Sequence, residues 1–393
     1  MNIVAITEQI PATDRKGNQL VAYYRLSHLA QLHNKIELIC FEGQNKNDDI
    51  KAKNKLERKG INVHLVKKNF LESLINLLKS IFSSKIPAQC AYSKSDKFAK
   101  KIKELINCLD IDMVYCVMIR VASNIEWYKG KLVVELIDSL GLNFHYRYLQ
   151  SKGLKRFFLY QEYKKVCRYE KNLANRSTCS FILSNIDKKK ISSNNINVIS
   201  NGVQLLNKKI IKKKKLKIVF SGNMFDQPNV DAVIWFIENC WTNILKKEPQ
   251  SKFLIVGHNP QSKIISLEKK YSSIEVTGSV KSIYNILKTA TVAVAPMQSG
   301  SGMQNKILEA MACSIPVVTT TKGLGDIKAI NNRDLLVADK PEEFTDMVVS
   351  LLKSKLKNDY ISSNGREYVA KFHNWYKINN RFFKIITKNK QSI

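Results

Sequence analysis

The stretch APMQSGSGMQNKILEAMACSIPVVTTT, residues 295–321, decides how this chain is organised. An apolar strand pattern at 291–296 leads into the turn SGSG at 299–302, then a helix pattern at 303–313 and a second strand pattern at 316–319. A turn of small residues directly before a helix lets backbone amides approach a ligand, and the helix dipole favours negative charge there. The run therefore predicts an anion site, although an ordinary crossover with a flexible turn has the same local pattern.

Two charged side chains extend this interpretation. Lys306 falls within about the first turn of the expected helix and adds a cation. Glu309 lies further along the same helix, where its carboxylate can accept hydrogen bonds from sugar hydroxyls. A phosphate site, a cation and a hydroxyl acceptor together describe a grip for a nucleotide sugar.

The motif SGSGMQNKILEAMA, followed by IPVVTT, resembles the donor-binding signature of family-4 glycosyltransferases. The resemblance extends over most of the chain and lies nearest to sugar transferases encoded with bacterial exopolysaccharide systems. It implies the α/β GT-B fold, in which two Rossmann-like domains face a cleft. It also implies donor contacts from Ser299, Gly300, Ser301, Gly302, Met303 and Gln304. Lys306 is the expected catalytic cation, because with the helix amides it can stabilise the leaving diphosphate.

The family's E-x7-E pattern is only half present. Its second Glu, which holds the nucleotide ribose in that family, maps to Glu309, but its first falls at Ser301. This departure concerns how the hydroxyls of the donor sugar are held. It leaves a catalytically inactive GT-B scaffold open as an alternative.

A chain of 393 residues is too long for one typical core, so two domains are expected. Short apolar strands alternate with helices in both halves, which indicates doubly wound parallel sheets. The expected division is a first, acceptor-binding domain at 1–206, a Lys-rich linker at 207–216, a donor-binding domain at 217–375 and a helix at 376–393 that returns to the first domain.

In the second domain, strand patterns end at or near Gly or Pro, and FSGNMFDQPN, FLIVG and VTGSV carry the resemblance. It implies donor contacts from Gly222, Asn223, Gly257, Gly278 and Val280. The Arg/Lys pair of many family members is absent after the first glycine turn, where Asn223, Met224 and Phe225 stand instead. Lys306 and backbone amides are therefore expected to carry more of the diphosphate charge.

The first domain offers two candidates at expected strand ends. Lys16 and Gly17 form a turn that the resemblance places against the donor phosphates, although a plain tight turn has the same sequence. Asp138 follows a strand pattern, where a carboxylate can orient an acceptor hydroxyl or take its proton. An N-cap for the following helical segment is the alternative for Asp138.

The composition excludes several classes of protein. No apolar run approaches the ~20 residues of a membrane-spanning helix, and the N-terminus lacks the pattern of a signal peptide. The eight cysteines contain no CxxC pair and the six histidines no HxxxH or HExxH spacing, so neither a metal nor another cofactor is expected beyond the nucleotide sugar as co-substrate.

The net charge of +31 is unevenly distributed. Residues 151–215 hold 17 Lys and Arg against three acids, whereas residues 216–336 hold 13 against nine. Residues 70–82 form an amphipathic helix pattern flanked by lysines, which fits either contact with an anionic membrane or packing on the domain's own core. Compositional bias or nucleic-acid binding would also account for the charge, but no nucleic-acid-binding motif accompanies it.

These observations predict a hexosyltransferase-type enzyme that moves a sugar from a nucleoside-diphosphate sugar to a hydroxyl of a glycan or lipid-linked acceptor. The resemblance implies retention at the anomeric carbon and a role in bacterial surface polysaccharide synthesis. The expected location is the cytoplasm, peripheral on the inner face of the cytoplasmic membrane. A basic nucleic-acid-binding protein remains the alternative from another class.

Overall fold

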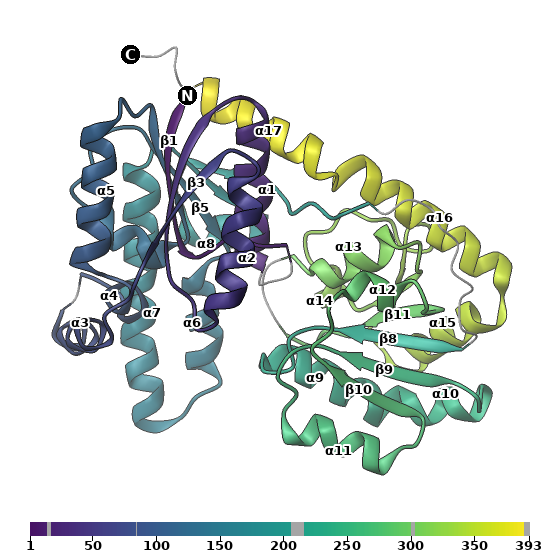
Figure 1. Cartoon of the computed structure of the whole chain (residues 1–393). Helices are drawn as coiled ribbons and strands as arrows, with labels where there is room; N and C mark the ends of the chain where they lie inside the picture. The colour runs from purple at the N-terminus through teal and green to yellow at the C-terminus, as the bar shows by residue number, and fades with distance from the viewer. Residues whose placement is uncertain (14–16, 84, 206–215, 300–302, 389–393) are drawn as a thin grey trace. The chain divides into compact units, whose positions relative to one another are not determined.

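The computed structural model describes residues 1–13, 17–83, 85–205, 216–299 and 303–388 (Figure 1). The chain divides into two compact units. Unit 1 consists of Met1–Ser200 together with Ile378–Ile393, and unit 2 of Asn201–Lys377. The division falls at residue 200, and the expected Lys-rich linker lies, apart from Leu216, outside the described residues.

Unit 1 is built on a seven-stranded parallel sheet in the order β3-β2-β1-β4-β5-β6-β7 (Figure 1). The strands are β1 (Asn2–Gln9), β2 (Lys35–Phe41), β3 (Ile61–Val66), β4 (Met113–Val117), β5 (Leu132–Ile137), β6 (Cys179–Ile182) and β7 (Ile196–Val198). Its helices are α1 (Gly17–Gln31), α2 (Lys46–Glu57), α3 (Phe70–Phe82), α4 (Ala88–Tyr92), α5 (Asp96–Cys108), the 3-10 helix η1 (Ile119–Ile125), α6 (Leu140–Leu149), α7 (Gly153–Arg176), α8 (Asn185–Ile191) and most of α17 (Trp375–Lys388).

The central strands β4 and β5 are buried along their whole length, as expected for a parallel sheet covered on both faces. Glu135 is the one charged residue in β5, and it is fully buried. The guanidinium of Arg25 in α1 lies 3.3 Å from its carboxylate, and the Tyr115 hydroxyl donates to it at 3.2 Å. This pairing offsets part of the cost of burying the charge.

Unit 2 contains a six-stranded parallel sheet in the order β10-β9-β8-β11-β12-β13 (Figure 1). The strands are β8 (Lys217–Ser221), β9 (Lys252–Val256), β10 (Ile274–Gly278), β11 (Val292–Ala295), β12 (Val317–Thr319) and β13 (Leu336–Val337). The helices are α9 (Gln227–Phe236), the π-helix η2 (Ile237–Trp241), α10 (Thr242–Lys247), α11 (Ser262–Lys270), α12 (Ile283–Leu287), α13 (Asn305–Ala312), α14 (Thr321–Leu324), α15 (Pro341–Lys353) and α16 (Lys355–Phe372).

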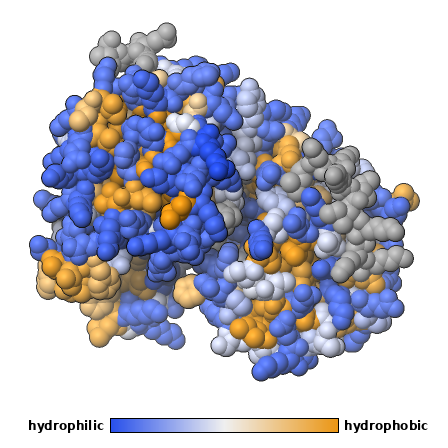
Figure 2. All heavy atoms as spheres, viewed as in Figure 1, coloured by the Kyte–Doolittle hydropathy of each residue, from blue (hydrophilic) through white to orange (hydrophobic). Residues whose placement is uncertain are grey.

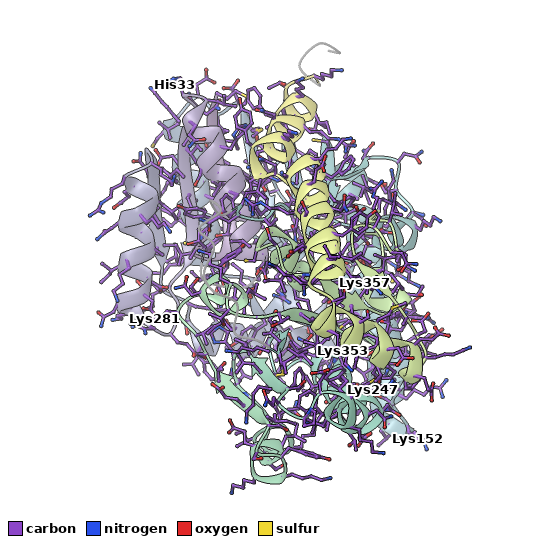
Figure 3. The ribbon with its side chains drawn as sticks, turned by 90° about the vertical axis from the view of Figure 1, so that its right-hand side faces the viewer. His33, Lys152, Lys247, Lys281, Lys353 and Lys357 are labelled. Atoms are coloured by element: carbon purple, nitrogen blue, oxygen red, sulfur yellow. The ribbon has the colours of Figure 1, made fainter. Side chains whose placement is uncertain are left out.

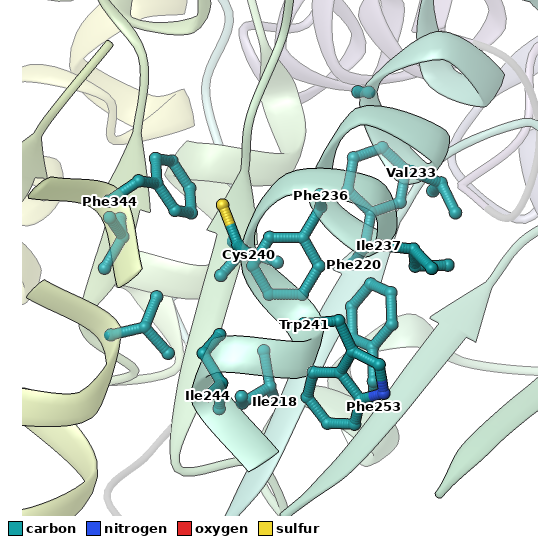
Figure 4. Close-up of a cluster of buried hydrophobic side chains, with 14 of the residues drawn as sticks. Ile218, Phe220, Val233, Phe236, Ile237, Cys240, Trp241, Ile244, Phe253 and Phe344 are labelled. Carbon is teal, nitrogen blue, oxygen red and sulfur yellow. The ribbon is translucent and has the colours of Figure 1, made fainter. Parts of the chain in front are cut away.

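An aromatic core fixes one face of the second sheet. Trp241 is fully buried, and the ring centroids of Phe236 and Phe253 lie 6.2 and 5.7 Å from its own (Figure 4). Phe344 of α15 meets Phe236 edge-on, with ring centroids 5.9 Å apart. This packing holds β8 and β9 in place, so that their carboxyl ends form a fixed edge.

The start and end of unit 2 are joined by hydrogen bonds. The backbone N–H of Val203 donates to the carbonyl of His373 at 2.8 Å, and a ring nitrogen of His373 lies 2.9 Å from the carbonyl oxygen of Asn201. After this closure, α17 packs into unit 1. Its Phe382 ring lies 4.7 Å from that of Phe181, and Asn379 accepts a hydrogen bond from Arg25 at 2.7 Å.

Two long helical regions are each divided. Residues 141–176 form α6 and α7, which are separated before Gly153, a residue in the left-handed conformation with φ +57°. The aromatic tail at 364–388 belongs to α16 and α17, with a break at residues 373–374. Within the described ranges, no helix is both long and apolar enough to cross a bilayer.

Candidate functional site

Three glycines form a row at the carboxyl edge of the second sheet. The backbone N–H of Gly222 donates to Val256 at 2.9 Å, and that of Gly257 donates to Gly278 at 3.1 Å, which links the ends of β8, β9 and β10. A Cβ atom on Gly257 would lie 1.6 Å from the carbonyl oxygen of Gly222. Gly278 has φ +64°. Glycine is therefore required at 257 by the close approach of the backbone and favoured at 278 by the left-handed conformation.

Lys306 lies in the first turn of α13, beside this edge. Its Nζ donates to Asn229 Oδ1 at 2.5 Å, contacts the sulfur of Met297 at 3.4 Å and lies 4.7 Å from the centre of the Phe220 ring. The side chain keeps some exposure, yet the protein around it is dense, and burial lowers the pKa of Lys306 to about 7. Glu309 and Asp226 oppose that shift through their charges.

Glu309 lies three residues further along α13, on the same side as Lys306. Burial raises the pKa of its carboxyl to about 7, and the nearby Lys306 opposes the shift. Among the described residues, no hydrogen bond to the Glu309 carboxylate is present. The carboxylate therefore keeps its acceptor capacity for a ligand, as a ribose-binding residue requires.

Asn229, in the first turn of α9, is a positioning residue that the sequence interpretation missed. Its Nδ2 donates to the carbonyl of Asn223 at 3.0 Å while its Oδ1 accepts from Lys306. One side chain thus joins the turn after β8 to the start of α13. A polar residue directly after Pro228, at the start of the helix that follows a strand-end glycine, was the signal that could have identified it.

The structure places the remaining predicted donor contacts of unit 2 as follows. Val280 and Met303 are half-buried and pack against one hydrophobic cluster, which also contains Ile307 and Leu308 of α13. Gln304 is the N-cap residue of α13 and makes no side-chain capping bond. Ser299 is half-exposed at the end of a described segment. Gly300, Ser301 and Gly302 lie outside the described residues.

The candidates in unit 1 belong to the other sheet. Gly17 is the exposed first residue of α1, and Lys16 lies outside the described residues. Asp138 follows β5 and accepts a hydrogen bond from Asn143 at 3.0 Å, while burial raises the pKa of its carboxyl. The N-cap alternative for Asp138 is wrong, because Ser139 caps α6 by accepting from Leu142.

Backbone strain is present at the carboxyl edge of the first sheet, where β4 and β5 end. Met118 directly follows β4, and Ile137 is the last residue of the adjacent strand β5. Both have positive φ, +73° for Met118 and +70° for Ile137. Such conformations are costly for residues other than glycine, above all for a β-branched one, and they concentrate at functional sites. They redirect the chain at the two points that position Arg120 and Asp138.

A cavity of about 260 Å³ lies at the same edge, and its lining residues are Glu8, Leu77, Ala88, Gln89, Tyr92 and Arg120. Arg120 Nη1 lies 3.0 Å from the Glu8 carboxylate, and its Nε donates to Gln89 at 2.8 Å. The sequence interpretation missed this site. Its signal was a charged residue near the end of β1 and another just after β4, strands that are neighbours in the sheet.

Across the described segments, no three His, Cys, Asp or Glu side chains gather in a group that could hold a metal ion. The cationic and acceptor groups at the edge of the second sheet are instead Lys306 and Glu309.

Comparison with known proteins places this arrangement in a family context. Residues 215–354 match the family described as glycosyl transferases group 1. A 44.6 kDa protein from the cps region of Klebsiella pneumoniae is 22% identical over 174 residues, 42% of this chain and 45% of that protein. A glycosyltransferase of Methanocaldococcus jannaschii is 23% identical over 184 residues, 45% and 46% of the two chains. The chain spans about half the length of these curated relatives.

Solved structures are similar over nearly the whole chain. Anabaena HepE, crystallised in complex with UDP, has a TM-score of 0.70 at 13% identity and covers 99% of this chain and 100% of its own. Sucrose-phosphate synthase from Thermosynechococcus elongatus has a TM-score of 0.72 at 15% identity and 98% coverage of both chains. Staphylococcus aureus TarM, in a complex that includes UDP, gives 0.72 at 13% identity, covering 98% of this chain and 99% of that one.

The fold defined by these likenesses is that of GT-B glycosyltransferases, with two Rossmann-like α/β domains, as the sequence predicted. The second of these domains carries the match to the group 1 glycosyl transferases. The resemblance seen in the sequence is therefore confirmed for the GT-B fold and, over residues 215–354, by the match to the group 1 glycosyl transferases.

Proposed function

We propose that the protein transfers a sugar from a nucleoside-diphosphate sugar to a hydroxyl group of a glycan or lipid-linked acceptor. The observation that carries the proposal is the pairing of Lys306 and Glu309 on α13, beside the glycine row of Gly222, Gly257 and Gly278. A cation and helix amides suit a diphosphate, and a carboxylate without a described hydrogen bond suits a ribose. Similar proteins were crystallised with UDP, which makes UDP-sugars the first donors to test.

In the proposed reaction, the acceptor oxygen forms a bond to the anomeric carbon as the bond from that carbon to the diphosphate breaks. The nucleoside diphosphate leaves with the electron pair, and Lys306 together with the amides of α13 stabilises its developing charge. The acceptor hydroxyl gives up its proton, and Asp138 is the candidate group in unit 1 to orient that hydroxyl or to receive the proton. The proposal includes retention at the anomeric carbon and requires no metal ion.

Binding and turnover test this proposal separately. A thermal-shift screen should find a nucleoside diphosphate or its sugar that raises the melting temperature, because a ligand that binds only the folded state stabilises it. Glu309→Ala should weaken donor binding by ~1–3 kcal/mol while the fold survives. Binding without sugar transfer or donor hydrolysis would favour the inactive scaffold. No shift with any nucleoside diphosphate would contradict the proposal.

The acceptor end of the proposal rests on helix α3. Seven of its large apolar side chains are exposed, namely Phe70, Leu71, Leu74, Ile75, Leu78, Ile81 and Phe82, whereas Ser73 and Ser80 are buried. Figure 2 shows an apolar surface at the place of α3, at the lower left of the view. Packing of this apolar face on the domain's own core, the alternative expected from the sequence, is therefore wrong.

Polar contacts attach α3 to the rest of unit 1. Glu72 accepts from the backbone N–H of Asp96 at 2.7 Å, and Asn76 donates to the carbonyl of Lys94 at 3.1 Å. Lys165 of α7 donates to the carbonyl of Ser80 at 2.7 Å. The helix thus uses its polar side for attachment and leaves its apolar side free, the arrangement of an interfacial membrane helix.

A second apolar surface starts α7, where Leu154, Phe157 and Phe158 are exposed beside Lys155 and Arg156. Exposed lysines also occur in unit 2, where Figure 3 labels Lys247 and Lys353, but these two pair with acids at 2.5 and 3.3 Å.

We propose that unit 1 binds anionic membrane through α3 and the start of α7, and that the protein acts at the cytoplasmic face in surface polysaccharide synthesis. A lipid-linked acceptor lies at such a surface.

A further inference from the structure

The cavity in unit 1 joins two chemically different surfaces. Leu77, Ala88 and the ring of Tyr92 form an apolar wall, and Leu77 belongs to α3, whose apolar residues are exposed. The polar lining residues are Glu8 and Arg120, at the carboxyl ends of β1 and β4, and Gln89 of α4, which are joined in one network. Ligands of parallel α/β sheets bind at this edge.

The polar wall has more donors than its internal bonds consume. Arg120 uses Nη1 for Glu8 and Nε for Gln89, and no bond from its Nη2 is present among the described residues. Gln89 accepts through Oε1, and its Nε2 likewise makes no bond there. Both Glu8 oxygens are occupied, one by Arg120 and the other by Ser93 at 3.2 Å. The groups without a bond, Arg120 Nη2 and Gln89 Nε2, are both hydrogen-bond donors, so they fit a ligand with several oxygen acceptors.

Lys68 adds a second cation beside the cavity, against the ring of its lining residue Tyr92. Its Nζ lies 3.9 Å from the centre of the Tyr92 ring, and within the described ranges no carboxylate forms an ion pair with it. Burial lowers the pKa of Lys68, the charge of Glu8 opposes this shift, and the charge of Arg120 adds to it. The Lys68 ammonium therefore lies within electrostatic range of both Arg120 and Glu8, but only Arg120 is paired with the carboxylate. An anionic ligand would relieve the repulsion between the two cations, whereas a further cation would increase it.

We propose that Lys68, Gln89 and Arg120 form an anion subsite that holds the phosphate of a lipid-linked acceptor, while the apolar chain next to that phosphate lies along Leu77 and the exposed face of α3. This inference rests on the proposed function for its acceptor, but it assigns a site and a chemical class of ligand that the donor site does not require. Arg120 also lies close enough to Asp138 for its charge to lower the pKa of that carboxyl against the effect of burial. The subsite and the candidate group for the acceptor hydroxyl are therefore within electrostatic range of each other, both at the carboxyl edge of the first sheet.

Hexyl phosphate is the probe, because it carries a phosphate monoester on a short apolar chain and remains in solution. Isothermal titration calorimetry should show binding to the whole protein, and both inorganic phosphate and hexanol should bind at least tenfold more weakly. Lys68→Gln and Arg120→Gln should each weaken hexyl phosphate binding by about tenfold or more, as expected for a lost hydrogen bond to a charged group. Equal affinity for inorganic phosphate would overturn the role of the apolar wall.

Lys103→Gln is the matched control, since Lys103 also lies over an aromatic ring of unit 1, 5.2 Å from the centre of Trp127, but away from the cavity. It should leave the affinity for hexyl phosphate unchanged. Arg120→Gln removes the partner of Glu8, so its melting temperature is measured as well. Lys68→Gln breaks no ion pair and keeps the test decisive if the Arg120 variant fails to fold.

Two further titrations separate the possible sources of phosphate and the two proposals. Dihexanoyl phosphatidylglycerol carries the phosphate diester of a bilayer lipid. If this lipid binds as tightly as hexyl phosphate and its binding depends equally on Lys68, the site binds the headgroups of bilayer lipids. The assignment to a lipid-linked acceptor is then overturned. UDP titration should be unaffected by Lys68→Gln. If the wild type binds neither UDP nor any other nucleoside diphosphate, that result counts against the proposed function alone. Hexyl phosphate binding that is unchanged in both variants would overturn this inference alone.

Discussion

Asn229 and Lys306, 77 residues apart, are joined by a hydrogen bond of 2.5 Å from the Lys306 ammonium to the Asn229 amide oxygen. The partner of the ammonium is neutral, and the neighbouring groups are a sulfur and an aromatic ring. The ammonium is therefore held in one place without a direct ion pair. Its charge remains available to a diphosphate, and the site is preorganised before the donor arrives.

The first prediction concerns this positioning. Asn229→Ala should lower turnover by about tenfold, because Lys306 loses the group that fixes it and the Asn223 carbonyl loses a donor. Asn229→Asp should instead reduce donor affinity, since the new carboxylate pairs with Lys306 and repels the diphosphate. Steady-state kinetics and UDP titration measure both. Asn364→Ala, which removes an exposed hydrogen bond within α16, is the control and should change neither.

The second prediction separates binding from chemistry at Lys306. If its charge acts mainly on the leaving diphosphate as the bond breaks, Lys306→Ala should lower turnover more than donor affinity. Calorimetry measures the donor affinity, and kinetics at saturating donor measure the turnover. Equal losses in both would make Lys306 an anchor for the ground state, and no loss in either would remove it from the site.

The third prediction is a pH dependence at Glu309. Burial raises its pKa to about 7 in the folded protein, so between about pH 4.5 and 7 the folded state binds a proton that the unfolded state does not. The stabilisation from that proton is present below about pH 4.5 and is lost as the pH rises through 7. Glu309→Gln, which cannot ionise, should therefore match the wild type near pH 4, below the pKa of the unfolded state, and exceed its unfolding free energy by about 1–2 kcal/mol near pH 8, after allowance for partial exposure.

Denaturant unfolding of the ligand-free protein at the two pH values measures this difference. Glu275→Gln removes an exposed carboxylate from β10, so its effect should be the same at both. A Glu309 variant that is less stable than the wild type near pH 8 would contradict the prediction, because the ionised carboxylate would then have a stabilising partner in the folded protein.

The fourth prediction compares two glycines of the row. Gly278→Ala meets no atom within 4 Å but must keep a left-handed backbone, so it should cost about 1–2 kcal/mol of stability. Gly257→Ala places a methyl group against the carbonyl of Gly222 and should cost more, because β8 and β9 must separate at their carboxyl ends. Urea unfolding of the two variants gives the order of their unfolding free energies. The reverse order would mean that this edge moves apart easily.

Strand-ending glycines, the helix that carries Lys306, and the alternation of strands and helices could all be predicted from sequence, because each depends on local pattern. Asn229 could not be assigned, since its role arises from two contacts that only the folded sheet brings together. The same holds for Arg120 and Glu8, which are 112 residues apart in the chain. Helical periodicity identified the apolar face of α3, but it does not say whether that face points inward. The structure shows it exposed, with Ser73 and Ser80 buried instead.

The fifth prediction is that unit 1 docks on anionic membrane through this exposed face. Each lysine near an anionic leaflet adds roughly 1 kcal/mol within a Debye length of about 8–10 Å. Several lysines and a partly inserted apolar helix then suffice for reversible binding. The protein should sediment with vesicles that contain anionic lipid, and less so as the salt concentration rises. A Leu74→Glu, Leu78→Glu double variant should bind much more weakly, because two carboxylates would have to enter the interface.

Leu356→Glu provides the matched control, because Leu356 is 86% exposed on α16 in unit 2 and lies outside the proposed surface. It should sediment as the wild type does. Since Leu74 and Leu78 are exposed, their replacement should leave the melting temperature and UDP binding unchanged, so a loss of sedimentation reports docking and not unfolding. If the wild type does not bind anionic vesicles even at low salt, the positive charge of unit 1 is a bias of composition. The exposed face of α3 would then require a protein partner, and the acceptor would be a soluble glycan.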